Sequence, residues 1–222
     1  MKKTGKTAII LGATGLTGNI LLQKLLLDDR YDSIKIFTRK PTGVEHAKLI
    51  EIHANLLELE MYKTDFSCND VFCCIGTTTK KTPNKDLYRQ IDFGIPVAAA
   101  KLCKENNIPI LLIISSIGAN AKSSVFYTKT KGEMEQAVLA FQIPNTYILQ
   151  PSFIVGDRKE KRVGEKLGIA LSKLVQPLLL GPAKKYRAIH AETIANAMIC
   201  LANNGFEKQI VSSEELQKIG KS

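Results

Sequence analysis

A glycine-rich turn, GATGLTG at residues 12–18, stands between an apolar run and an amphipathic stretch near the start of the chain. Thr7 to Leu11 predicts a buried strand, and Leu16 to Leu27 has the apolar spacing of a helix. In such a unit the first glycine permits a tight turn, the second lets the backbone approach a pyrophosphate, and the third allows close helix–strand packing. Unpaired N–H groups at the start of the helix favour the phosphates. The turn therefore predicts a dinucleotide site at Gly12, Thr14, Gly15, Leu16, Thr17 and Gly18.

Short apolar runs and amphipathic stretches alternate along the next part of the chain. Strands connected by helices of this length predict a parallel sheet that is covered on both faces. The fold class expected is therefore α/β, a doubly wound parallel sheet of the Rossmann type. Further strands are expected at Ser33–Thr38, Leu49–His53, Asp70–Ile75, Pro109–Ser115 and Asn145–Leu149, with helices at Leu87–Glu105, kinked near Pro96, and Tyr127–Phe141.

The pattern changes after Pro151. Helices are expected at Gly164–Val175 and Ala191–Ala202, and a strand at Gln209–Ser212 precedes a terminal helix capped by Ser213. These residues are too few for an independent domain. We therefore expect one domain over residues 1–222, in which residues 151–222 form a short lobe on the substrate side.

The second predicted strand ends in two cations, Arg39 and Lys40. An NAD site usually has an acidic side chain here, which bonds the adenosine ribose. Arg39 and Lys40 instead suit the 2′-phosphate of NADP, to which they can donate charge-assisted hydrogen bonds. NADP is therefore favoured over NAD. The alternative is that Arg39 and Lys40 are simply solvated residues at a strand end.

The ends of the third and fourth strands are expected beside the adenine and a ribose of the coenzyme. Asn55 and Leu56 follow the third strand, and Ile75, Gly76 and Thr77 follow the fourth. Gly76 would let the backbone pass close to the coenzyme.

Tyr127 and Lys131 are four residues apart in a predicted helix, so they share one face. A phenol with a pKa near 10 is a poor acid or base at neutral pH unless a cation stabilises its phenolate. Lys131 can do this and can also bond the nicotinamide ribose. Ser115 and Ser116 end the fifth strand, where a hydroxyl can point at a substrate carbonyl. The set predicts acid–base catalysis at a carbonyl.

Together these residues resemble the short-chain dehydrogenase/reductase superfamily, and above all its atypical Tat-interacting oxidoreductase-like branch. The resemblance implies that Tyr127 is the catalytic acid/base, Lys131 its partner and ribose ligand, and Ser116 the hydroxyl that orients the carbonyl, with Ser115 in reserve. It also places Pro151 to Val155 beside the nicotinamide. It spans nearly the whole chain and rests on residues 12–18, 38–40, 73–78, 115–119, 127, 131 and 156–158.

The chain departs from the pattern of that branch at three positions. Thr79 stands where an arginine is expected, which bears on substrate recognition. Gln150 replaces an arginine before Pro151, and Ser152 replaces a glycine after it. The last two bear on the loop that flanks the nicotinamide.

The resulting prediction is an NADP-dependent oxidoreductase that transfers a hydride between nicotinamide and a small carbonyl or alcohol substrate. The alternative is an NADP(H)-binding regulatory protein, because members of the resembled branch have short C-terminal lobes and often unclear substrates. Nucleic acid is disfavoured as a partner, since the net charge of +10 is spread over the chain. The apolar stripe of residues 164–180 suggests packing on the sheet, with a membrane or a second subunit of a homo-oligomer as the alternative.

The sequence also carries expectations about location and metal content. The longest clean apolar run, Ile110 to Ile114, is far shorter than the roughly 20 residues of a membrane span. The first apolar run leads straight into the glycine turn, unlike a signal peptide. Five cysteines and three histidines lack disulfide or metal-ligand spacing. We therefore expect a soluble cytoplasmic protein without a metal.

Overall fold

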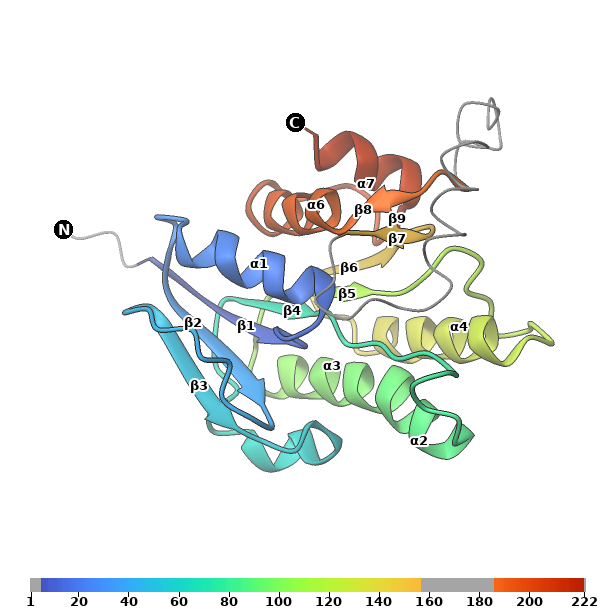
Figure 1. Ribbon diagram of the computed structural model, residues 1–222, viewed down its shortest axis with the longest axis horizontal. Coiled ribbons are helices and arrows are strands. Elements are labelled where there is room, and N and C mark those ends of the chain that lie inside the picture. Colours follow the sequence, from blue (N-terminus) through green and yellow to red (C-terminus); the bar gives the residue numbers. More distant parts are fainter. Residues whose placement is uncertain (1–4, 157–185, 222) are drawn as a thin grey trace.

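A seven-stranded parallel sheet forms the centre of the protein, as seen in a computed structural model that describes residues 5–156 and 186–221 (Figure 1). The strand order is β3-β2-β1-β4-β5-β6-β9. This confirms the predicted fold class. The strands are β1 (Lys6–Leu11), β2 (Tyr31–Thr38), β3 (Leu49–His53), β4 (Asp70–Cys73), β5 (Ile110–Ile114), β6 (Asn145–Gln150) and β9 (Ile210–Ser212).

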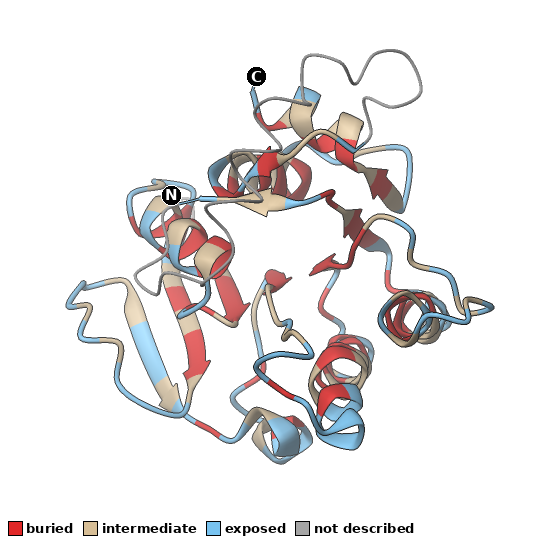
Figure 2. Cartoon of the chain, turned by 45° about the vertical axis from the view of Figure 1, so that its right-hand side comes forward, coloured by how far each residue is buried: buried red, intermediate tan, exposed pale blue. Residues whose placement is uncertain are grey.

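Helices cover both faces of this sheet (Figure 1). On one face lie α1 (Leu16–Leu26), α6 (Ala191–Asn204) and α7 (Ser213–Ile219), and on the other lie α3 (Ile95–Glu105) and α4 (Phe126–Leu139). Neighbouring residues of a strand point to opposite faces, so Ile10 packs in the first core and Ile9 in the second. Figure 2 shows the central strands buried, whereas the edge strand β3 is largely exposed.

The strand order reverses between β1 and β4, which are direct neighbours. From β1 the chain proceeds outward through β2 and β3, then returns to β4 and continues to β5 and β6. Leu11, the last residue of β1, pairs with Phe37 of β2 and with Cys73 of β4, so these strands end level with one another. In open α/β sheets, ligands bind outside the carboxyl ends of the strands at such a reversal. The glycine turn begins there.

The predicted helix at Leu87–Glu105 is irregular before Pro96 rather than at it. It consists of α2 (Lys85–Arg89), a π-helical turn η2 (Gln90–Gly94) and α3, in which Pro96 belongs to the first turn. The Ile95 N–H bonds the Gln90 carbonyl, five residues back. A proline has no N–H to donate and its ring crowds the carbonyl four residues earlier, so the wider turn accommodates it.

The described residues after Pro151 contribute to the central sheet and to its first core. β9 pairs with β6, and β7 (Ile154–Val155) pairs with β8 (Ile189–His190) in a separate two-stranded sheet. The role of residues 151–222 as a substrate-side lobe stays a prediction, and the helix expected at 164–175 lies outside the described residues. Within the described ranges, no helix is long and apolar enough to cross a bilayer.

The N-cap of the last helix is Ser212, so the prediction of Ser213 is wrong by one residue. The Ser212 hydroxyl accepts the Glu215 N–H and the Glu215 carboxylate accepts the Ser212 N–H, forming a capping box. Only Ser212 has a glutamate three residues later. The Ser213 hydroxyl instead accepts the Ser152 N–H at 3.2 Å.

Candidate active site

The glycine turn has the geometry that its sequence predicts. Gly12 has a φ of 85°, and a Cβ there would lie 2.9 Å from the Cys74 carbonyl oxygen. A Cβ on Gly18 would lie 2.2 Å from the Gly12 carbonyl oxygen, so only glycine permits α1 to start this close to β1. Gly15 is the N-cap of α1 and offers no side chain to the first N–H groups.

The other residues of this turn differ in exposure. Thr14 is exposed, Leu16 is half-buried, and Thr17 is buried in the first turn of α1. No acidic side chain lies in that first turn. The start of α1 therefore keeps its partial positive charge, which suits an anionic ligand.

Arg39 and Lys40 are exposed immediately after β2, the strand beside β1. The Thr38 hydroxyl donates a hydrogen bond to the Lys40 carbonyl at 2.8 Å, which orders the backbone of this strand end. Both cations thus stand at the same edge of the sheet as the glycine turn.

The end of β3 is shaped by a cap. The Asn55 carboxamide oxygen accepts the Leu57 N–H at 3.2 Å and starts the short 3-10 helix η1 (Leu56–Tyr62). Leu56 is half-buried against the second core. This bond uses the side-chain oxygen of Asn55. The side-chain NH₂ group stays at the sheet edge, where the sequence predicts the adenine.

A buried ion pair lies beside the end of β4. The Lys131 Nζ is 2.8 Å from Asp92 Oδ1, and the two side chains are 4% and 0% exposed. The second Asp92 oxygen accepts the Thr77 N–H at 2.8 Å. Gly76 lies beside this pair, because a Cβ there would be 3.7 Å from Asp92 Oδ1 and 3.9 Å from Lys131 Nζ. The neighbouring Ile75 is half-buried and packs against the second core.

Asp92 is a site residue that the sequence analysis missed. It sits in the π turn η2, inside a helix that faces α4, and no motif includes it. The available signal was an acid in the otherwise apolar stretch IDFGIP, just before a proline. π turns often occur at functional sites, because they redirect one side chain within a helix.

The two serines after β5 have different surroundings. The Ser115 hydroxyl donates to the Glu135 carboxylate of α4, which also accepts the Gln150 amide at 3.0 Å. Burial raises the pKa of Glu135, although the bonds from Ser115 and Gln150 oppose this. Ser116 is buried, and its hydroxyl has no partner among the described residues. Ser116 is therefore the hydroxyl that remains available to a ligand.

Tyr127 lies on the first turn of α4 with 37% of its surface exposed. Within residues 5–156 and 186–221, no hydrogen bond joins it to Ser116 or Lys131. Buried Pro151 follows β6, and its carbonyl accepts the Ile117 N–H at 2.9 Å. This bond ties the strand end that is predicted beside the nicotinamide to the segment after Ser116.

These observations together fit a pyridine dinucleotide. Three glycines shape the turn at the start of α1, Gly76 lies beside the buried Lys131, and the Ser116 hydroxyl has no partner among the described residues. An unsatisfied buried hydroxyl is unfavourable unless a ligand or water completes it. In the part of the chain that the structure describes, no group of three or more acidic, histidine or cysteine side chains is placed to hold a metal ion.

Comparison with known proteins yields no matching family model, but it finds curated relatives that span the chain. Protein FMP52-1, mitochondrial, of Scheffersomyces stipitis is 30% identical over 91% of this chain and 90% of its own length. Protein HTATIP2 of Rattus norvegicus is 30% identical over 75% of this chain and 70% of its own length. The chain belongs to the FMP52/HTATIP2 family. This confirms the resemblance to the Tat-interacting branch of atypical short-chain dehydrogenases/reductases.

Solved structures with the same fold include nucleotide-sugar enzymes. The UDP-glucose 4-epimerase of Thermotoga maritima matches with a TM-score of 0.69 and 14% identity, over 97% of this chain and 81% of the epimerase. MoeE5 in complex with UDP-glucose and NAD matches with a TM-score of 0.68 and 15% identity, over 96% and 80% of the two chains. At this identity the match shows that the FMP52/HTATIP2 chain shares their Rossmann-like fold.

The prediction of a cytoplasmic location is wrong by these comparisons. FMP52 of Candida albicans is 29% identical over 97% of this chain, and its name includes the word mitochondrial, as do those of other fungal relatives. Secretory signals and membrane spans, on which the cytoplasmic prediction rested, do not bear on delivery to an organelle. A compartment is not encoded in the composition of a folded domain.

Proposed function

We propose that this FMP52/HTATIP2 family member is an NADP-dependent oxidoreductase that transfers a hydride between nicotinamide and a small carbonyl or alcohol substrate. The observation that carries the proposal is the buried Lys131, which lies beside Gly76 at the end of β4 and on the helix that also presents Tyr127. The unpartnered Ser116 hydroxyl supports it. MoeE5, which shares the fold, is described as a complex with NAD, and this supports a dinucleotide ligand.

Each polar group of the site has a distinct role in reduction. NADPH, when bound, supplies the hydride that forms the new C–H bond at the carbonyl carbon. Tyr127 gives its hydroxyl proton to the carbonyl oxygen, which becomes the alcohol. Ser116 donates a hydrogen bond that orients this oxygen. Lys131 bonds the ribose and its charge favours the phenolate that Tyr127 becomes.

The preference for NADP rests on Arg39 and Lys40, which are exposed at the end of β2 next to the glycine turn. The 2′-phosphate of NADP is an anion and can pair with these two cations through charge-assisted hydrogen bonds. The ribose hydroxyls of NAD are neutral and cannot form such ion pairs. Calorimetric titration of the protein with NADPH and with NADH tests this. We expect tighter binding of NADPH, and equal affinities would remove the assignment.

Tyr127→Phe tests the catalytic role. Loss of a positioned proton donor lowers a rate by about 100-fold or more. We expect that loss in NADPH oxidation with a panel of carbonyl compounds, while the Kd for NADPH stays within about twofold of the wild type. Unchanged turnover would rule out the role. Coenzyme binding without turnover of any carbonyl by the wild type would favour the regulatory alternative.

A further inference from the structure

Tyr88 carries a buried hydroxyl that no group in the described chain satisfies. Tyr88 is 1% exposed, and its Oη has no hydrogen-bond partner in residues 5–156 or 186–221. Its ring packs edge-on against Phe126, with 5.3 Å between the ring centroids. An unsatisfied hydroxyl in such surroundings destabilises the fold, whereas phenylalanine would fill the same space without this cost. The hydroxyl therefore has no evident structural use.

The position of Tyr88 connects it to the candidate active site. Tyr88 lies one turn before Asp92, so both residues share a face of the α2–η2 segment. Asp92 pairs with Lys131 of α4, and Tyr88 packs on Phe126, the residue before Tyr127. Successive turns of this segment thus face successive turns of α4, and Tyr88 stands at the level of Tyr127.

The Tyr88 phenol is a donor at physiological pH. Burial raises its pKa strongly, and the neighbouring Asp92 and Tyr127 raise it further. A phenol in this state stays protonated and can give its hydrogen to an acceptor. The complementary ligand atom is therefore an oxygen acceptor, such as a hydroxyl, carbonyl or carboxylate oxygen.

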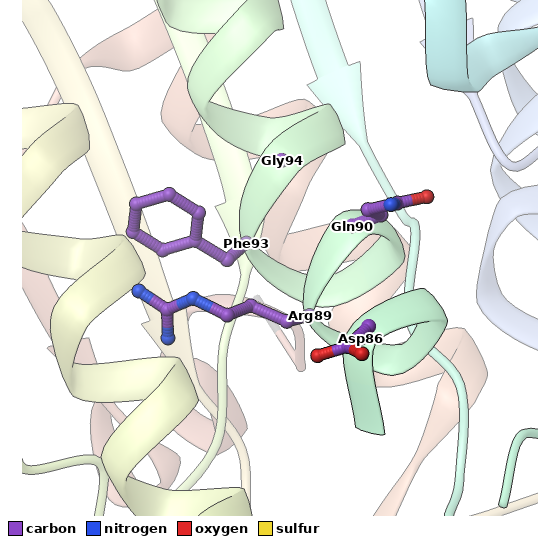
Figure 3. A pocket seen from close by; sticks show the side chains of 5 residues that line it. All are labelled: Asp86, Arg89, Gln90, Phe93 and Gly94. Atoms are coloured by element: carbon purple, nitrogen blue, oxygen red, sulfur yellow. The ribbon is translucent and has the colours of Figure 1, made fainter. Parts of the chain in front are cut away.

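The same helical segment also carries a separate hollow of about 330 Å³ (Figure 3). It is lined by Asp86, Arg89, Gln90, Phe93 and Gly94, which are spaced by three and four residues and so form a face of their own. The Arg89 guanidinium lies 4.5 Å from the Phe93 ring centroid and pairs with Glu133 of α4. Neither Tyr88 nor Asp92 lines this hollow.

We propose that the Tyr88 hydroxyl is a further binding group of the active site, which donates a hydrogen bond to an oxygen of the bound coenzyme or of the substrate beside Tyr127. The inference rests on the proposed function, because it takes these two molecules as the ligands. It assigns to Tyr88 a role that explains why an unsatisfied hydroxyl is kept next to the Asp92–Lys131 pair.

Tyr88→Phe is the test, with three measurements on the full chain. We expect an apo Tm equal to or above that of the wild type, since the variant removes an unsatisfied donor. If the acceptor belongs to the coenzyme, the Kd for NADPH rises about tenfold. If it belongs to the substrate, kcat/KM for carbonyl reduction falls about tenfold while that Kd is unchanged.

Tyr147→Phe is the matched control. Tyr147 is also buried, at 4% exposure, but its oxygen accepts the Phe206 N–H at 3.1 Å and lies outside the proposed site. This variant should lose Tm and keep both kinetic and binding constants. The inference is overturned if Tyr88→Phe lowers Tm as much as the control does, or if it leaves both Kd and kcat/KM unchanged.

The outcomes separate this inference from the proposed function. A wild type that turns over substrate and loses activity in Tyr127→Phe, with no effect of Tyr88→Phe, overturns only the role of Tyr88. A wild type that binds NADPH but reduces no carbonyl overturns the oxidoreductase proposal. In that case Tyr88 is judged by the Kd for NADPH alone, and an unchanged value overturns its role.

Discussion

Two adjacent serines, Ser115 and Ser116, end up in different environments although their chemistry is the same. Ser115 donates to Glu135, and Ser116 has a buried hydroxyl without a partner in the described chain. The difference arises because α4 places a carboxylate beside one serine and not beside the other. At this scale, a residue becomes available to a ligand because its neighbours leave it unbonded.

Gly132, the residue after Lys131, sets how closely the loop after Ser116 approaches α4. A Cβ there would lie 2.2 Å from the Ala121 nitrogen and 2.3 Å from the Asn120 carbonyl carbon. Gly132→Ala should push the loop from the helix, destabilise the fold by about 1 to 3 kcal/mol and lower kcat/KM. Urea unfolding and NADPH oxidation measure the two effects.

Gly94→Ala is the control for this substitution. Gly94 is also helical, with a φ of −62°, but nothing lies within 4 Å of its ideal Cβ. Alanine there should leave stability unchanged or raise it by up to about 1 kcal/mol. Equal stabilities of the two variants would contradict the proposed close approach at Gly132.

Among the elements, α7 owes its start to a cap that also carries charge. Glu215 completes the capping box with Ser212 and pairs with Lys208 at 2.7 Å. Burial tends to raise the pKa of Glu215, but the bonds from Lys208 and Ser212 outweigh it and lower the pKa below its usual value. A lowered folded-state pKa means that the carboxylate stabilises the folded state at neutral pH.

Glu215→Gln should therefore destabilise the protein by about 1 kcal/mol at pH 7. The difference from the wild type should shrink as the pH falls through the folded-state pKa, because the wild-type carboxylate then becomes neutral too. Unfolding free energies from urea titrations at pH 7 and pH 3 measure it. Glu214→Gln, in the same first turn, should change little. A pH-independent loss would contradict the ionic part of this cap.

At the scale of the whole molecule, a polar cluster ties the first strand to the C-terminal helices. Lys6 Nζ is 2.6 Å from Asp70 Oδ2 and 3.0 Å from the Ala202 carbonyl oxygen. The same Asp70 oxygen accepts the Tyr31 hydroxyl at 2.6 Å, and Asn203 donates to that hydroxyl at 3.1 Å. The cluster joins β1, β2 and β4 to α6, at the edge of the sheet opposite the glycine turn.

Lys6→Met tests this connection through its dependence on pH. Burial raises the pKa of Asp70, while the bonds from Lys6 and Tyr31 oppose the rise. Without Lys6 the pKa of Asp70 should rise further. When the pKa of Asp70 is higher in the folded state than in the unfolded chain, the folded state loses stability as the pH rises above the usual pKa of an aspartate. We expect a loss of about 2 to 3 kcal/mol at pH 8 and a smaller loss at pH 5.

The measurement is the unfolding free energy in urea at both pH values. Lys24→Met is the matched control, because Lys24 is about as exposed as Lys6 and also reaches α6, through a pair with Glu192 at 2.9 Å. The Glu192 side chain is 66% exposed, whereas that of Asp70 is fully buried. The effect of Lys24→Met should be below about 1 kcal/mol. Losses of equal size at pH 5 and pH 8 in Lys6→Met would contradict the role of the Asp70 charge.

The sequence by itself determined the parallel α/β sheet, the turn at Gly12 to Gly18 and the strand ends that carry Arg39 and Gly76. These features follow local rules, because apolar periodicity and the conformational freedom of glycine depend only on residues close together in the sequence. The location in the cell was predicted wrongly, because delivery to an organelle does not depend on how the domain folds.

Only the tertiary structure decided that Asp92 reaches Lys131, that Ser115 rather than Ser116 is bonded to Glu135, and that the Tyr88 hydroxyl lies buried beside α4. Each of these depends on how two helices or a strand and a helix pack, over separations of 20 to 39 residues in the chain. Sequence periodicity shows which face of an element is buried. It does not show which side chain of the next element meets that face.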